Sequence, residues 1–213
     1  MPSASGMATE SNKALMERVC SLGNNCEVGI AQRVCGAEPE DLLRWSITQP
    51  NMLVNMLIRR FEGIADLDKI VVEPATNGSF WPVHVDYRHG WHAWTRDLTK
   101  TADDIRLREH MRLPERAARL MDDLRANERI FVIKNTQFPN HVLEHLRKAF
   151  SLYGNPLVLL VTDGADVQVR EDGDFLFGSI PCFADNGNVP ATTDVKSWLE
   201  LFRLVDERHP SRT

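Results

Sequence analysis

The residues in this sequence best suited to catalysis are a cysteine, a histidine and an aspartate. Cys26 follows Asn24 and Asn25, two residue types that commonly cap helices, and it precedes apolar residues at helical spacing. The N–H groups and the dipole of a helix N-terminus favour a thiolate, so this position predicts a cysteine with a lowered pKa. Such a nucleophile needs an imidazole to carry the proton and a polar group to orient that imidazole. His92 and Asp86 share the polar face of one predicted strand and fit these two roles.

The loop before Cys26 also supplies groups that would stabilise a tetrahedral intermediate. The side chains of Asn24 and Asn25, or the Cys26 backbone N–H, are candidate oxyanion donors. Trp45 and Trp91 are candidate substrate-binding residues because tryptophan is enriched at binding surfaces. Together these residues predict thiol-dependent acyl chemistry, in which Cys26 attacks an amide or ester carbonyl.

A second stretch, His141 to His145, reads HVLEH and matches the H-x-x-E-H zinc pattern. Both imidazoles would lie one turn apart on a helix, and Glu144 would serve as the base of a zinc hydrolase. The same helix, however, has an apolar stripe that leaves these three residues on its solvated side. We therefore expect a surface helix here, with a zinc hydrolase as an alternative.

Two further histidines, His84 and His89, are alternatives to His92 as the base beside Cys26. The three histidines, together with Cys182, are also an alternative metal cluster. In a continuous strand His89 points away from the other two, which disfavours that cluster. We expect neither a metal nor another cofactor.

The composition indicates a single domain with no nucleic-acid or membrane partner. The 213 residues carry a net charge of −5, and no stripe of basic and aromatic residues suggests binding to a phosphate backbone. No apolar run approaches the roughly 18 residues that span a bilayer, and the N-terminus lacks the features of a signal peptide. Four cysteines without paired spacing are typical of reduced thiols, which predicts a cytoplasmic protein. We expect a disordered lead over 1–12, a domain over 13–206 and a frayed tail over 207–213.

The pattern of apolar residues predicts an α/β fold. Residues 103–127 read as a charged helix that is broken near Pro114, because proline removes a helical hydrogen bond. A strand over 129–135, a helix over 140–152 and a strand over 156–163 then form a β-α-β unit, which implies that the two strands are parallel. A hairpin over 165–180 follows. The other expected elements are a helix over 26–35, a helix over 51–61, strands over 69–74 and 80–94, and a final helix over 194–205.

The stretch VCSLGNNCEVGIAQRV resembles the opening of the DUF1796 family, which is described as papain-like cysteine peptidases. The resemblance implies a papain-like mixed sheet with a nucleophile-bearing helix packed against it, and Cys26 as the nucleophile. That family has a strand with a Tyr-Gly pair that is followed shortly by His-Asp, whereas this chain reads HGWHAWTRD and has Arg96 before Asp97. The departure leaves open a displaced base, Asp97 or Asn135 as the orienting residue, or a site without activity.

We therefore expect a thiol-dependent hydrolase or acyltransferase that acts on a small-molecule, peptide or glycan-linked acyl substrate. The alternative is a non-catalytic module that binds carbohydrate or protein and in which Cys26 is structural. In that module a groove would be lined by Trp45, Trp81, Trp91 and Trp94. The substrate and the oligomeric state are left open by the sequence.

Overall fold

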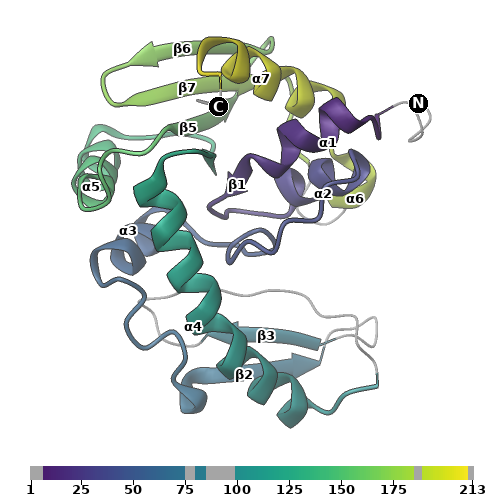
Figure 1. The fold of residues 1–213 in the computed structure, drawn as a ribbon, viewed down its shortest axis with the longest axis vertical. Helices are drawn as coiled ribbons and strands as arrows, with labels where there is room; N and C mark the ends of the chain where they lie inside the picture. The colour runs from purple at the N-terminus through teal and green to yellow at the C-terminus, as the bar shows by residue number, and fades with distance from the viewer. Residues whose placement is uncertain (1–6, 75–79, 85–98, 185–188, 211–213) are drawn as a thin grey trace.

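A five-stranded mixed sheet forms the centre of the protein, as the computed structural model shows for residues 7–74, 80–84, 99–184 and 189–210 (Figure 1). The strand order is β1-β4-β5-β7-β6. The first four strands run parallel to one another, and β6 pairs antiparallel with β7. The strands are β1 (Val19–Ser21), β4 (Ile130–Lys134), β5 (Val158–Asp163), β6 (Gln168–Asp172) and β7 (Phe175–Ile180). The predicted α/β class is confirmed, while the papain-like arrangement stays a prediction.

Helices cover both faces of this sheet. The apolar side chains of the central strands β4 and β5 project alternately to the two faces, and each face therefore needs a helical layer to bury it. One core contains residues of α3 (Pro50–Ile58), α4 (Ala102–Ala126) and α5 (Asn140–Ser151). The other contains residues of α1 (Glu10–Glu17), α2 (Glu27–Val34) and α7 (Val195–Arg208). A short helix, α6 (Val189–Thr192), precedes α7. The expected β4-α5-β5 unit and the β6-β7 hairpin are both confirmed.

A second, two-stranded sheet lies beside the first half of α4 (Figure 1). Its strands β2 (Ile70–Pro74) and β3 (Phe80–His84) pair antiparallel, and a short 3-10 helix, η2 (Leu67–Lys69), leads into β2. The helix α4 runs from this small sheet to the central sheet and so joins the two parts of the fold. The predicted strand over 80–94 is described only as far as His84.

The predicted break of α4 near Pro114 is wrong, because the helix is continuous from Ala102 to Ala126. Proline at this position removes one backbone hydrogen bond. The helix persists because one stripe of its residues is buried along its whole length, so packing outweighs the lost bond. The buried stripe consists of Ile105, Glu109, Leu113, Ala117, Leu120 and Leu124.

The folded part of the chain extends beyond the expected limits of 13–206 at both ends. Helix α1 begins at Glu10, because the Thr9 side chain accepts a hydrogen bond from the Asn12 backbone and caps it. Helix α7 continues to Arg208, and an ion pair between Arg18 and Asp206 ties it to the end of α1. The two terminal helices therefore pack on each other over the sheet.

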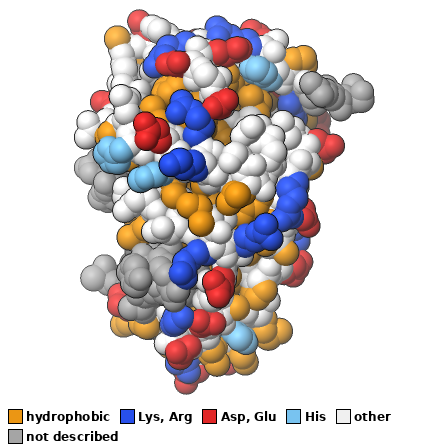
Figure 2. Space-filling model, turned by 90° about the vertical axis from the view of Figure 1, so that its left-hand side faces the viewer, with side chains coloured by type: hydrophobic (Ala, Val, Ile, Leu, Met, Phe, Trp, Pro, Cys, Tyr) orange, Lys and Arg blue, Asp and Glu red, His pale blue; other side chains and the backbone are white. Residues whose placement is uncertain are grey.

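Surface charges of both signs are interspersed on the face that Figure 2 shows. Hydrophobic side chains lie between the charged ones on this face. Among the described residues, no helix combines the length and the apolar character needed to cross a bilayer.

Candidate active site at the carboxyl end of β1

The connection from β1 to α2 is a tight turn with unusual backbone angles. Gly23, Asn24 and Asn25 have φ values of 104°, 68° and 147°. Such positive values are readily adopted by glycine, and asparagine tolerates the left-handed value of Asn24, whereas the φ of Asn25 is rare for a residue that has a side chain. A side chain at Gly23 would also collide with Thr48, whose Cβ lies 2.8 Å from the position of an added Cβ. The turn therefore requires glycine at position 23 and is strained at Asn25, and strained backbone of this kind is concentrated at functional sites.

Cys26 is itself the N-cap of α2, immediately after this turn, whereas the sequence predicted an asparagine as the cap and Cys26 as the first residue of the helix. Its side chain is partly exposed and caps no backbone N–H group of the helix. Because β1 is a parallel strand of the central sheet, the turn places Cys26 at the carboxyl edge of that sheet. Ligands of open α/β sheets bind outside this edge.

The expected lowering of the Cys26 pKa is wrong. Burial of the thiol and, second, the negative charge of Glu27 raise its pKa to about 11. The helix N-terminus still favours negative charge, but an eight-residue helix offers a weak field and the adjacent carboxylate opposes it. Cys26 is therefore a neutral thiol at physiological pH.

A buried ion pair that the sequence did not reveal lies next to Cys26. Glu27 is fully buried, and its carboxylate contacts the ammonium of Lys134, the last residue of β4, which is 7% exposed. The same carboxylate accepts hydrogen bonds from Asn25 Nδ2 at 2.9 Å and from the Ala184 backbone N–H at 2.6 Å. Two buried charges with this many polar partners form a stable unit, which holds the turn, β4 and the segment after β7 together.

Sequence reasoning missed this pair because its two partners are 107 residues apart. One signal was present: Lys134 ends a strand whose preceding four residues are all apolar. A lysine in that position needs a buried partner, because an unpaired buried charge is costly.

The side chains of both asparagines in the turn form hydrogen bonds within the protein. Asn24 Nδ2 donates to the Lys134 carbonyl at 2.9 Å, and Asn24 Oδ1 accepts from Gln49 Nε2 at 3.0 Å. Asn25 binds both the backbone and the carboxylate of Glu27. Within the part of the chain that the structure describes, the Cys26 backbone N–H has no hydrogen-bond acceptor. Of the three predicted oxyanion donors, this N–H is therefore the one that makes no hydrogen bond to another described residue.

Trp45 packs on α2, one turn beyond Cys26. A side chain at Gly29 would lie 2.9 Å from the Trp45 ring, so the absence of a side chain lets the indole approach the helix. The guanidinium groups of Arg33 and Arg44 lie 4.5 and 4.6 Å from the ring centroid. Trp45 therefore packs against α2. Its side chain is also partly exposed, as contact with a ligand would require.

Several predicted site residues lie outside the described residues. These are His92, Asp86, Trp91, His89, Asp97 and Trp94. His84 and Trp81 belong to β3, and only their backbone is described. The assignment of the base and of its orienting residue therefore stays a prediction. Asn135, the other candidate for orienting the base, donates a hydrogen bond to the Gln137 carbonyl at 2.8 Å, beside Asn24.

The zinc pattern lies on the solvated side of α5. His141, Glu144 and His145 are exposed, and the two imidazole centroids are 6.5 Å apart. No cluster of three or more potential metal ligands occurs among residues 7–74, 80–84, 99–184 and 189–210. The expected surface helix is confirmed there.

Comparison of the chain with protein-family models, with curated proteins and with solved structures finds no match. The resemblance to DUF1796 therefore stays a prediction that depends on the residues around Cys26.

Proposed function

We propose that this protein catalyses thiol-dependent acyl chemistry, either hydrolysis or acyl transfer, with Cys26 as the nucleophile. One observation carries the proposal: a strained turn from a parallel strand to a helix presents a partly exposed thiol at the carboxyl edge of the sheet. The buried pair of Glu27 and Lys134 fixes the start of the helix and so fixes the position of the thiol.

A thiol with a raised pKa requires a base in the reaction step itself. We assign this role to His92, with Asp86 orienting the imidazole. As the Cys26 sulfur bonds to the carbonyl carbon of the substrate, its proton passes to His92, and the carbonyl oxygen becomes an oxyanion. The Cys26 backbone N–H donates a hydrogen bond to this oxygen. Collapse of the intermediate expels the leaving group with the proton from His92, and water or an acceptor hydroxyl then removes the acyl group.

The test is formation of an acyl-enzyme with p-nitrophenyl acetate, followed by peptide mass spectrometry. We expect acetylation of Cys26 at neutral pH, with release of one equivalent of p-nitrophenol before the slower turnover. Cys26→Ala should abolish this burst. Cys182→Ala is the matched control, because Cys182 is the exposed cysteine and lies outside the proposed mechanism.

The second candidate is a non-catalytic binding module, and the raised pKa of Cys26 favours it because a neutral thiol is a poor nucleophile without a base. Acetylation confined to Cys182, or an unchanged burst in Cys26→Ala, would support this module and refute the enzyme.

A further inference from the structure

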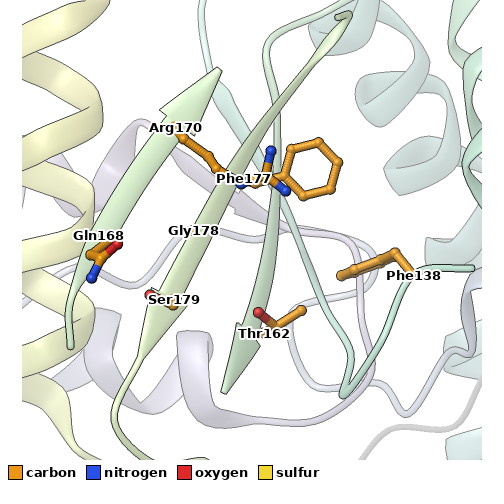
Figure 3. A pocket seen from close by; sticks show the side chains of 7 residues that line it. All are labelled: Phe138, Thr162, Gln168, Arg170, Phe177, Gly178 and Ser179. Atoms are coloured by element: carbon orange, nitrogen blue, oxygen red, sulfur yellow. The ribbon is translucent and has the colours of Figure 1, made fainter. Parts of the chain in front are cut away.

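A cavity of about 270 Å³ lies on the five-stranded sheet, on the face that packs against α5 (Figure 3). No residue of the β1–α2 connection lines this cavity, so an inference from it stands apart from the thiol chemistry. Two phenyl rings, two hydroxyls, a carboxamide and a guanidinium surround the space: Phe138, Phe177, Thr162, Ser179, Gln168 and Arg170.

The strand register places these groups in two rows. Thr162 and Gln168 both pair with Ser179, from opposite sides, so three polar side chains form one row across β5, β7 and β6. Phe177 pairs with Arg170 in the neighbouring row. Because cross-strand partners project from the same face, the polar and aromatic rows form adjacent parts of one surface. Their positions are fixed by the sheet.

Ser179, the middle residue of the polar row, is held in place by a hydrogen bond. The Ser179 hydroxyl donates to the Asp166 carbonyl at 2.7 Å, which leaves its oxygen lone pairs as acceptors. Phe138 comes from the segment between β4 and α5, and Figure 3 shows it pointing toward the strands that carry Thr162 and Phe177. Phe138 and Phe177 therefore supply apolar surface to a cavity that the polar row also lines.

Arg170 is the one charged residue among the described residues that line the cavity. Its guanidinium carbon lies 4.4 Å from the Phe177 ring centroid, so the ring holds the guanidinium beside the cavity. Its ion pair with Asp172, at 3.0 Å, has both side chains more than 60% exposed, at 64% and 63%. An exposed pair of this kind contributes little free energy, so Asp172 competes only weakly with an anionic ligand.

We propose that this cavity binds a small aromatic carboxylate. The aromatic ring contacts Phe138 and Phe177, and the carboxylate accepts hydrogen bonds from the guanidinium of Arg170 and the carboxamide of Gln168. A cavity of 270 Å³ is at the small end of ligand sites, which fits a single ring better than a nucleotide. None of the described residues that line it has an acidic side chain that would repel the carboxylate.

The test is a titration followed by two-dimensional NMR, with benzoate as the probe and benzyl alcohol as the neutral analogue. We expect benzoate to shift amide resonances of β5, β6 and β7 and to bind about tenfold more tightly than benzyl alcohol, the gain typical of hydrogen bonds to a charged group. Arg170→Gln should remove this preference. The exposed position of Arg170 makes the variant easy to fold, and its NMR spectrum verifies this directly.

Arg147→Gln is the matched control. Arg147 forms an equivalent ion pair with Asp174 at 2.9 Å and lies 5.6 Å from the Phe175 ring, but it does not line the cavity. We expect this variant to change benzoate affinity by less than about twofold, as is usual for a surface change away from a binding site. Equal losses in the two variants, equal affinities for benzoate and benzyl alcohol, or shifts confined to other elements would overturn the proposal.

Discussion

Cys26 should react slowly with an alkylating reagent at neutral pH, because burial and the Glu27 carboxylate raise its pKa to about 11. At pH 7 such a thiol is about 0.01% ionised, whereas a free cysteine with a pKa of about 8.5 is about 3% ionised. This roughly 300-fold deficit of thiolate is offset about tenfold, because a more basic thiolate is a better nucleophile. We therefore expect iodoacetamide to alkylate Cys26 about 30-fold more slowly than free cysteine.

The assay is peptide mass spectrometry of a Cys182→Ala variant that has been sampled over time. This variant removes the exposed competing thiol, and the two remaining cysteines, Cys20 and Cys35, are buried. The rate should rise with pH throughout the range below 11, since each increase in pH adds thiolate until the thiol is ionised. A rate at pH 7 equal to that of free cysteine, or a plateau below about pH 9, the upper end of the ordinary range, would refute the argument.

Two further predictions concern stability and are measured by urea unfolding. Lys134→Met should lower the free energy of unfolding by about 3–5 kcal/mol, because it leaves the buried Glu27 carboxylate without its counter-charge. Arg119→Met, which breaks the exposed pair with Glu115, is the control and should lower the free energy of unfolding by less than about 1 kcal/mol. Equal losses of stability in the two variants would contradict the role of burial. Pro114→Ala should raise the free energy of unfolding by about 1–3 kcal/mol, since α4 is continuous there and alanine restores the missing N–H donor; a loss of stability would show that the ring itself is needed.

Local patterns predicted those parts of the fold whose partners are close in sequence. The β4-α5-β5 unit and the β6-β7 hairpin follow from short runs of apolar residues with turn residues between them. The helix expected over 51–61 likewise corresponds to α3, which begins at Pro50 and ends at Ile58. The prediction from Pro114 was wrong. The sequence shows that proline removes a helical hydrogen bond, but it does not show the long buried face of α4 that compensates for this loss.

The candidate site was predictable in its position but not in its electrostatics. The Asn-Asn-Cys turn identified where α2 starts, since asparagine is common in the turn before a helix, although Cys26 and not an asparagine is the N-cap. The pKa of Cys26 depends on the burial of its thiol and on the charge of Glu27, and Glu27 is in turn held by Lys134 and Ala184, which are distant in sequence. Because of this burial, the expected resting state of Cys26 changes from a thiolate to a neutral thiol, which would need a base in order to react.

The most direct test of the central claim compares two reactions of Cys26 in the native protein and in a His92→Ala variant at pH 7. If a neutral thiol is deprotonated by His92 as it attacks, acetylation by p-nitrophenyl acetate should fall by about 100-fold or more in the variant, the usual contribution of a general base. Alkylation by iodoacetamide should change by less than about threefold, because it follows the resting thiolate population. Acetylation that is unaffected by His92→Ala, or that falls only as much as alkylation does, would contradict the account.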